Sequence, residues 1–132
     1  MSRPVATVPP RGVYAPVVCF FDEDENIDAG ALEAHIARLA TAGVAGLVVQ
    51  GSNGEAPHLL HSERIEVTAL ARRVLDKHGR KDAAIIAGCG AQSTKETILL
   101  CREAKDAGAD FALVLSPSYW SERQPQPLWR CH

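Results

Sequence analysis

The sequence lacks the features that mark membrane, nucleic-acid-binding and disulfide-stabilised proteins. Its hydrophobic residues occur in short runs interrupted by Gly, Pro or charge, and none approaches the roughly 18 residues that a membrane-spanning helix requires. The formal charge is -2, and no basic cluster is present to attract nucleic acid. The four cysteines form no CxxC pair, which favours reduced thiols over a disulfide framework or a zinc site. These absences predict an ordinary soluble, cytoplasmic protein with no metal or cofactor and no nucleic-acid or membrane partner.

Two terminal segments are predicted to lie outside the folded domain. Residues 1–11 contain two arginines and three prolines but no hydrophobic stretch of a signal peptide, so we expect a disordered lead-in rather than a targeting peptide. Residues 122–132 end in Gln-Pro-Gln-Pro-Leu-Trp-Arg-Cys-His, which has no helical period and looks foreign to the rest of the chain. The predicted domain therefore covers residues 12–121.

Within this domain, short apolar runs alternate with longer segments of helical period, which is typical of βα units around a parallel sheet. The predicted strands are 13–21, 44–50, 83–87 and 111–115, and the predicted helices are 28–43, 62–78 and 93–107. Four strands and three helices are half of a (β/α)₈ barrel, which takes about 250 residues. The expected fold class is therefore α/β, a (β/α)₈ TIM barrel truncated to about its first four strands and three helices. A flavodoxin-like open sheet is the alternative, although it would normally carry a fifth strand and a final helix.

Local signals predict where the helices end and which faces are buried. Asp28 is a plausible N-cap, and Gly43 stands where a C′ glycine is expected. The run Ser93-Thr94-Lys95-Glu96 has the form of a capping box, in which Ser93 and Glu96 bond each other's backbone N–H groups. The second helix is expected to direct four side chains inward: Ile65, Leu70, Val74 and Leu75.

The most informative segment is Gly51-Ser52-Asn53-Gly54-Glu55, which directly follows an apolar strand. Barrel enzymes keep their active sites at this end of the strands. Two glycines let the backbone turn tightly and bring N–H groups close to a ligand, so the loop could receive the carboxylate of a small acid. Because Gly, Ser and Asn also form ordinary turns, a plain βα turn remains an equal alternative at this point.

The residues from Gly51 to Pro57, followed by Ser62-Glu63-Arg64-Ile65-Glu66-Val67, closely resemble the dihydrodipicolinate synthase and N-acetylneuraminate lyase family. The Ser-Asn form of the loop looks most like the 4-hydroxy-2-oxoglutarate aldolase branch. Further matches are Gly12-Val13-Tyr14-Ala15-Pro16-Val17, Ala87-Gly88-Cys89-Gly90-Ala91 and Pro117-Ser118-Tyr119. The resemblance runs in register over residues 12–121.

The resemblance implies a class I aldolase, in which a lysine forms a Schiff base with a 2-oxo acid and a tyrosine relay moves protons. Ser52 is similar to the hydroxyl of that relay, and Gly51, Ser52 and Asn53 to the positions that bind the substrate carboxylate. Tyr119 resembles the relay tyrosine that one subunit lends to its neighbour, so the resemblance implies a homo-oligomer. The alternative for Tyr119 is a buried or rim aromatic beside Trp120.

Some family features are missing from this sequence. The family's Schiff-base lysine lies on the sixth strand and a second phenolic acid on the fifth, so neither can be assigned here. The four lysines in the chain are expected to have surface roles: Lys77, Lys81, Lys95 and Lys105. Cys19-Phe20 replaces the family's usual Thr-Pro. Leu60 replaces the usual small N-cap before the second helix, so Ser62 is expected to cap instead.

Three other patterns are set aside. Gly88-Cys89-Gly90-Ala91-Gln92-Ser93 lacks the third glycine of a dinucleotide fingerprint. His58 and His61 could pair at a metal only in a helix, and Pro57 favours a loop. The acidic run 22–25 is expected to be a solvated turn.

Two functions follow from these residues. The first is a Schiff-base carbon–carbon lyase acting on 2-oxo acids, such as 4-hydroxy-2-oxoglutarate, which it cleaves to pyruvate and glyoxylate. The second is a catalytically inactive half-barrel that binds a ligand or a full-length partner through its open sheet edges. The family branch includes mitochondrial members, so a mitochondrial location also stays open.

Overall fold

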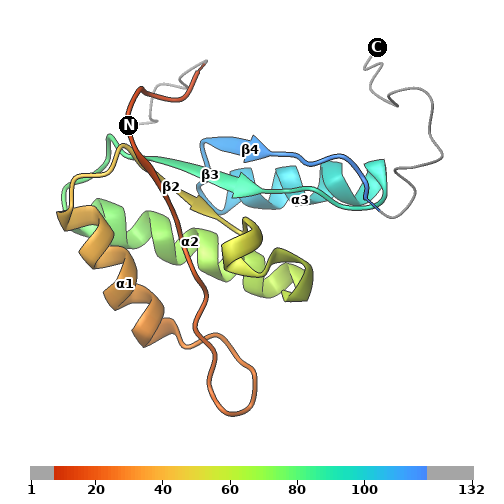
Figure 1. Cartoon of the computed structure of the whole chain (residues 1–132), viewed down its shortest axis with the longest axis horizontal. Helices are drawn as coiled ribbons and strands as arrows, with labels where there is room; N and C mark the ends of the chain where they lie inside the picture. The colour runs from red at the N-terminus through yellow and green to blue at the C-terminus, as the bar shows by residue number, and fades with distance from the viewer. Residues whose placement is uncertain (1–7, 119–132) are drawn as a thin grey trace.

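The computed structural model describes residues 8–118, which form an α/β fold around a parallel sheet (Figure 1). In chain order the elements are β1 (Tyr14–Pro16), α1 (Ala29–Thr41), β2 (Gly46–Val49), the 3₁₀ turns η1 (Ser52–Gly54) and η2 (Ala56–His58), α2 (His61–Lys77), β3 (Ala84–Gly88), α3 (Thr94–Asp106) and β4 (Phe111–Leu113).

The order of the strands distinguishes the two predicted architectures. All neighbouring pairs are parallel, and the strands stand in the order β1-β2-β3-β4. A doubly wound sheet reverses direction and places its first strand inside the sheet, whereas here each crossover moves one position in the same direction. The flavodoxin-like alternative is therefore wrong, and the sequential order is that of a (β/α)₈ barrel.

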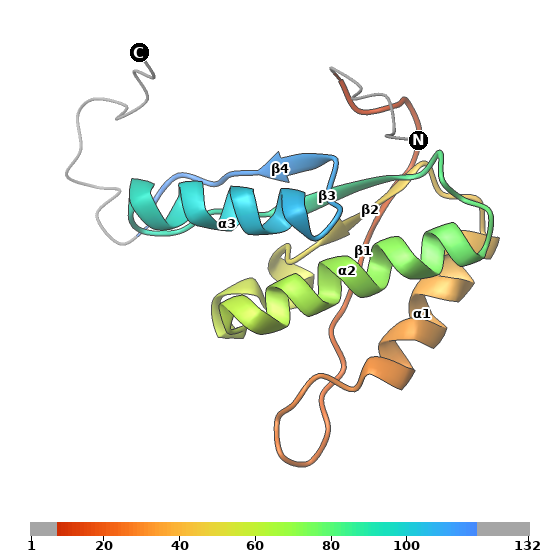
Figure 2. The ribbon, with the colours of Figure 1, turned by 180° about the vertical axis from the view of Figure 1, so that it is seen from behind.

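One face of the sheet is covered and the other is open. Alternate residues of β2 and β3 are fully buried against the helices: Leu47, Val49, Ile85 and Ala87. The view from behind shows α2 and α3 in front of the sheet (Figure 2). On the opposite face Val48 and Ile86 are only half-buried, and Leu113 of β4 is 40% exposed. Within residues 8–118 the sheet therefore has a single packed layer of helices.

The structure confirms the predicted ends of α1 and half of the capping box at α3. The Asp28 carboxylate accepts from the Ala31 N–H at 2.9 Å, and Gly43 follows the helix with φ at +77°. The Ser93 hydroxyl accepts from the Glu96 N–H at 3.1 Å. The Glu96 carboxylate, however, lies 3.7 Å from His61 rather than being hydrogen-bonded to the Ser93 backbone.

Two expectations for α2 are wrong. Ile65 is 38% exposed, whereas Leu70, Val74 and Leu75 are buried as predicted. Leu70 is five positions after Ile65, and five helical steps of about 100° turn the Ile65 side chain about 140° away from the buried face. Ser62 does not cap the helix: α2 begins at His61, and the Glu63 carboxylate accepts from the Leu60 N–H at 2.6 Å.

The first strand is much shorter than the predicted range 13–21. The Val17 N–H still donates to the Val48 carbonyl at 2.9 Å, and the chain then leaves the sheet. Residues 22–25 form an exposed turn, as expected, in which the Asp22 carboxylate accepts from the Asp24 and Asn26 N–H groups.

Two arginines hold the edge where the strands begin. Arg72 of α2 lies 2.6 Å from the Asp110 carboxylate, which also accepts from the Ile85 N–H at 2.9 Å. Arg80 donates to the Ala40 and Val44 carbonyls at 3.0 and 2.7 Å. These bonds tie the helices to the starts of β2, β3 and β4, at the end opposite the loop that follows β2.

The predicted lead-in and tail fall largely outside the described residues, and so do Tyr119 and Cys131. The domain limits 12–121 therefore stay predictions. Among residues 8–118, no helix is both long and apolar enough to cross a membrane.

Candidate functional site

A cavity of about 710 Å³ lies at the carboxyl ends of the strands, where the sequence places the candidate site. Its wall consists of the segments that follow β2, β3 and β4, together with the first turns of α2 and α3. The lining includes Gly51, Ser52, His61, Arg64, Gly90, Gln92, Glu96, Leu115 and Ser118.

The predicted loop forms the 3₁₀ turn η1 at one side of this cavity. Gly51 and Ser52 line the cavity, whereas Asn53 is exposed and is not part of its lining. Gly54 is buried, and a Cβ there would stand 3.0 Å from the Val17 carbonyl oxygen. Within residues 8–118, the backbone N–H groups of Ser52 and Asn53 donate to no other residue, as expected at the start of a helical turn. These groups are available to an anionic ligand.

Gln50 sets the direction in which this loop leaves β2, and the sequence analysis missed it. Gln50 has a left-handed backbone, with φ at +50°, and only 3% of its surface is exposed to solvent. Its side-chain Nε2 donates to the Arg64 carbonyl at 2.8 Å and lies 3.1 Å from the Thr68 hydroxyl. A polar residue at the end of the apolar run Leu-Val-Val was the available signal, since a buried amide needs partners.

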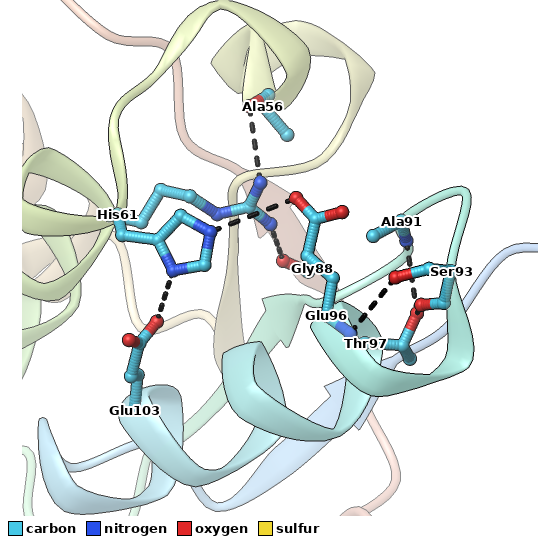
Figure 3. A network of polar contacts seen from close by, with 9 residues as sticks. Ala56, His61, Gly88, Ala91, Ser93, Glu96, Thr97 and Glu103 are labelled. Carbon is cyan, nitrogen blue, oxygen red and sulfur yellow. Dashed lines mark hydrogen bonds and ion pairs between the residues drawn. The ribbon is translucent and has the colours of Figure 1, made fainter.

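Arg64 is the second residue that the sequence analysis missed. Its guanidinium donates to the Gly88 carbonyl at the end of β3 and to the Ala56 carbonyl, 3.2 Å away, in η2 (Figure 3). Burial lowers the pKa of Arg64, and the neighbouring Cys89, Glu96 and Glu103 act in the opposite direction. An arginine remains charged under such opposing effects, so it places a positive charge in the cavity wall.

His61 joins α2 to α3 beside the cavity. Its Nδ1 lies 2.8 Å from the Glu103 carboxylate and its Nε2 lies 3.7 Å from the Glu96 carboxylate (Figure 3). His58 is exposed in η2. Among the described residues, no three His, Cys, Asp or Glu side chains gather as a metal site would require.

The four lysines are exposed, as the sequence analysis expects. Lys77 lies 3.0 Å from the Glu33 carboxylate at the far end of α2. Lys95 stands in the first turn of α3, and its side chain is not part of the cavity lining. None of the four provides a desolvated amine.

Two cysteines lie close to the site. Burial raises the pKa of Cys19 to about 11, and the carboxylates of Glu55 and Glu63 add to this. Its thiol is 3.4 Å from the Gly54 carbonyl, so Cys19 packs behind the η1 turn. Burial raises the pKa of Cys89 to about 12, with Cys101 as the next cause. Both thiols are therefore protonated at neutral pH.

Comparison with known proteins gives a consistent result. Residues 9–127 match the dihydrodipicolinate synthetase family. The chain is 53% identical over 109 residues to a protein of Emericella nidulans named "Probable 4-hydroxy-2-oxoglutarate aldolase, mitochondrial", which covers 83% of this chain and 35% of the relative. It is 46% identical over 110 residues to the L-threo-3-deoxy-hexylosonate aldolase of Aspergillus niger, a match that covers 83% of this chain and 33% of that relative.

Solved structures agree with this. A dihydrodipicolinate synthase family protein from Coccidioides immitis superposes with a TM-score of 0.80 at 39% identity, over 87% of this chain and 37% of that chain. A prophage protein of the same family from E. coli K12, in complex with pyruvate, superposes with a TM-score of 0.74 at 35% identity. The match covers 83% of this chain and 35% of that chain. The chain thus spans about a third of the length of the relatives it matches, and its fold is the N-terminal part of a (β/α)₈ barrel.

Proposed function

The chain belongs to the dihydrodipicolinate synthetase family, and from that premise we propose that it carries the 2-oxo-acid-binding part of a Schiff-base carbon–carbon lyase. The observation that carries the proposal is the position of Gly51 and Ser52 at the wall of the 710 Å³ cavity, at the carboxyl ends of the parallel strands. Catalytic groups of (β/α)₈ barrels lie at this end.

The proposed carboxylate site consists of the η1 turn. The Ser52 and Asn53 N–H groups are open to an acceptor, and hydrogen bonds to a charged acceptor contribute about 1.5 to 3 kcal/mol each. Arg64 lies in the same cavity wall, but the Glu55 and Glu96 carboxylates also line the cavity and offset its charge, so the proposal rests on the N–H groups of the turn. Two or three such interactions suffice to fix one end of a small 2-oxo acid.

The remaining roles are proposed from the family. The Ser52 hydroxyl passes a proton along a relay with Tyr119, which lies outside the described residues and which the family lends to a neighbouring subunit of a homo-oligomer. The Schiff-base lysine is none of Lys77, Lys81, Lys95 and Lys105, because each is exposed and a class I lysine must be a neutral amine in a desolvated pocket. The chain then supplies the binding half of the site.

The proposed substrate is 4-hydroxy-2-oxoglutarate, cleaved to pyruvate and glyoxylate. The names of the relatives from Emericella nidulans and Coccidioides immitis support this choice, and the L-threo-3-deoxy-hexylosonate aldolases are the next candidates. Both 4-hydroxy-2-oxoglutarate aldolase names also include "mitochondrial", so a mitochondrial location is proposed beside the cytoplasmic one.

A chimera tests the proposal. This chain would replace the matching first third of the Emericella nidulans relative, and the chimera would be incubated with pyruvate and borohydride. Formation of the Schiff base releases one water and borohydride then adds a hydride, with a proton from solvent, across the C=N bond, so one lysine gains the mass of pyruvic acid less one oxygen atom. We expect trapping in the chimera and loss of most trapping in its Ser52→Pro variant, because proline at the first position of η1 removes the Ser52 N–H and is tolerated at the start of a helical turn. The Ser52→Ala variant keeps that N–H and should still be trapped. A folded chimera that is never trapped would contradict the proposal.

A second candidate function is association with another chain. Leu113, Val114 and Leu115 are three consecutive exposed hydrophobic residues along and after the edge strand β4. An unpaired strand edge beside exposed apolar residues favours pairing with a further strand. In this role the half-barrel binds a full-length partner rather than substrate.

Size-exclusion chromatography and thermal melting of the chain distinguish this candidate. Association through the β4 edge predicts a species larger than a monomer, which Leu113→Lys, Leu115→Lys shifts toward the monomer. A sharp melt of a monomer at every concentration would argue against it.

A further inference from the structure

Arg64 contacts two of the segments that border the cavity. Its Nη2 donates to the Gly88 carbonyl at the end of β3, and its Nη1 donates to the Ala56 carbonyl in η2 at 3.2 Å. Figure 3 draws both carbonyl groups with a dashed line to each. One guanidinium therefore connects the loop after β2 to the end of β3.

The main chain of Arg64 holds a third point, the end of β2. Its carbonyl accepts from Gln50 Nε2 at 2.8 Å and from the Thr68 hydroxyl at 2.9 Å. Gln50 is a non-glycine residue in the left-handed region, a conformation that persists only when its surroundings hold it there. Because Gly51 and Ser52 follow Gln50 directly, these bonds determine where the cavity-lining turn begins.

The ends of β2 and β3 are also in direct contact. A Cβ on Gly88 would stand 1.8 Å from the Gln50 carbonyl oxygen, so no side chain fits between them. A displacement of Gly88 must therefore move Gln50 and the turn that follows it. The bonds from Arg64 act on one packed unit rather than on independent loops.

A guanidinium suits this arrangement better than other side chains. It is planar, it carries five N–H donors in a fixed fork, and it can serve two carbonyls that point in different directions. A lysine at the same position has a shorter reach sideways and would satisfy the two carbonyls less well. Arg64 is half-buried, so a carbonyl that loses its donor at this position cannot be fully hydrated by water instead. Replacement of the guanidinium therefore costs more free energy here than it would at an exposed site.

We propose that Arg64 is a positioning residue that fixes the spacing between the Ser52 turn and the Gly88 strand end, and thereby the shape of the cavity. The statement that this cavity receives a 2-oxo acid rests on the proposed function. The positioning itself does not depend on the identity of the ligand.

Hydrogen exchange of single amides, measured by NMR on the whole chain, tests the proposal. The informative amides are Cys89, whose N–H donates to the Leu113 carbonyl at 2.9 Å, and Gly54, whose N–H donates to the Gly51 carbonyl at 3.0 Å. In Arg64→Gln we expect both amides to exchange about tenfold faster or more, which corresponds to losing a hydrogen bond from a charged donor. In Arg64→Lys we expect exchange rates between those of the original chain and those of Arg64→Gln, since the lysine can still donate to one of the two carbonyls.

Arg72→Gln is the matched control, because Arg72 is a second arginine of α2 that joins strands at the opposite end of the sheet. It lies 2.6 Å from Asp110, which accepts from the Ile85 N–H. We expect this variant to speed exchange of Ile85 and to leave Cys89 and Gly54 within about twofold of the original chain. A general loss of stability would instead speed all three amides equally in both variants.

Titration with pyruvate separates this proposal from the proposed function. Faster exchange of Cys89 and Gly54 in Arg64→Gln supports the positioning role whether or not pyruvate binds. If neither the original chain nor the chimera binds pyruvate, only the proposal that the cavity binds a 2-oxo acid is contradicted. Unchanged exchange of Cys89 and Gly54 overturns the positioning role. The positioning role is also overturned if these amides are already unprotected in the original chain, because the proposal requires a fixed spacing between the Ser52 turn and the end of β3.

Discussion

The ring of Tyr14 lies directly over Gly46 on the neighbouring strand. A Cβ on Gly46 would stand 2.6 Å from Tyr14 Cε1 and 2.3 Å from the Ala84 carbonyl oxygen. Gly46 pairs with Tyr14 on one side and with Ala84 on the other, so the glycine sits at the centre of three strands. We predict that Gly46→Ala lowers the free energy of unfolding by about 3 kcal/mol, as overpacking of a rigid site does.

Two control variants locate the cause of that loss. Gly30→Ala places a Cβ 3.4 Å from the Asp28 side chain inside α1, which is ordinary contact, and it should be neutral or stabilising by about 0.5 kcal/mol. Tyr14→Ala combined with Gly46→Ala should not restore stability, because the Ala84 carbonyl is backbone and cannot turn away. Urea denaturation measures all three, and recovery in the double variant would refute the backbone explanation.

Gln50 provides a second prediction, since its backbone strain and its hydrogen bonds can be separated. Gln50→Ala keeps the left-handed backbone but leaves Thr68 and the Arg64 carbonyl without the amide, so we expect a loss of about 2 kcal/mol. Gln50→Gly loses the same bonds but relieves a strain of about 1 kcal/mol, because glycine adopts positive φ freely. The glycine variant should therefore be the more stable of the two in chemical denaturation, and the opposite order would count against a strained Gln50.

Two ion pairs should differ in their contribution to stability. The Arg72 and Asp110 side chains are 14% and 25% exposed and also bond backbone groups, whereas the Lys77 and Glu33 side chains are 67% and 40% exposed. We expect Asp110→Ala to cost about 2 kcal/mol, because it removes the ion pair with Arg72 and leaves the Ile85 N–H without its acceptor, while Arg72 keeps Asp76 and the Gly108 and Ala83 carbonyls. Lys77→Ala should cost less than about 1 kcal/mol. Chemical denaturation of both variants in the same buffer measures these losses. Equal losses of unfolding free energy would show that burial does not determine how much each ion pair contributes.

The buried thiols predict a loss of stability at alkaline pH. Burial raises the pKa of Cys19 to about 11 and that of Cys89 to about 12, from an ordinary value of 9.0 in the unfolded chain. The folded state binds these protons more tightly, so their stabilising contribution is complete below pH 9 and is lost as the pH rises through 11 and 12. Between pH 8 and pH 10.5, Tm should fall less in Cys19→Ala, Cys89→Ala than in the original chain. Parallel falls in the two proteins would contradict this reading of the thiols.

Much of the secondary structure could be predicted because its signals are local. The Asp28 cap bonds a backbone N–H three residues away, and Gly43 is the C′ residue of the same helix. The buried residues Leu70, Val74 and Leu75 follow the helical period. The prediction of Ile65 as buried was wrong because it did not follow that period: Ile65 is turned about 140° from Leu70 around the helix axis.

The candidate site was predicted in part. The loop at Gly51 and Ser52 was found from its glycines and its place after an apolar strand, and both residues line the cavity. Gln50 and Arg64 were not found. Their partners lie 8 to 24 residues away in the chain, and no local pattern shows which carbonyl a buried amide or guanidinium will meet.

The amino-acid sequence by itself determined the alternation of strands and helices, the caps of α1 and α3 and the position of the glycine-rich turn, because each depends on residues within one or two helical turns. Tertiary structure alone decided the order of the strands, the left-handed backbone of Gln50 and the reach of Arg64 from α2 to β3. Those features are set by which distant segments pack together, since a strained or charged group is stable only where the rest of the fold supplies its partners.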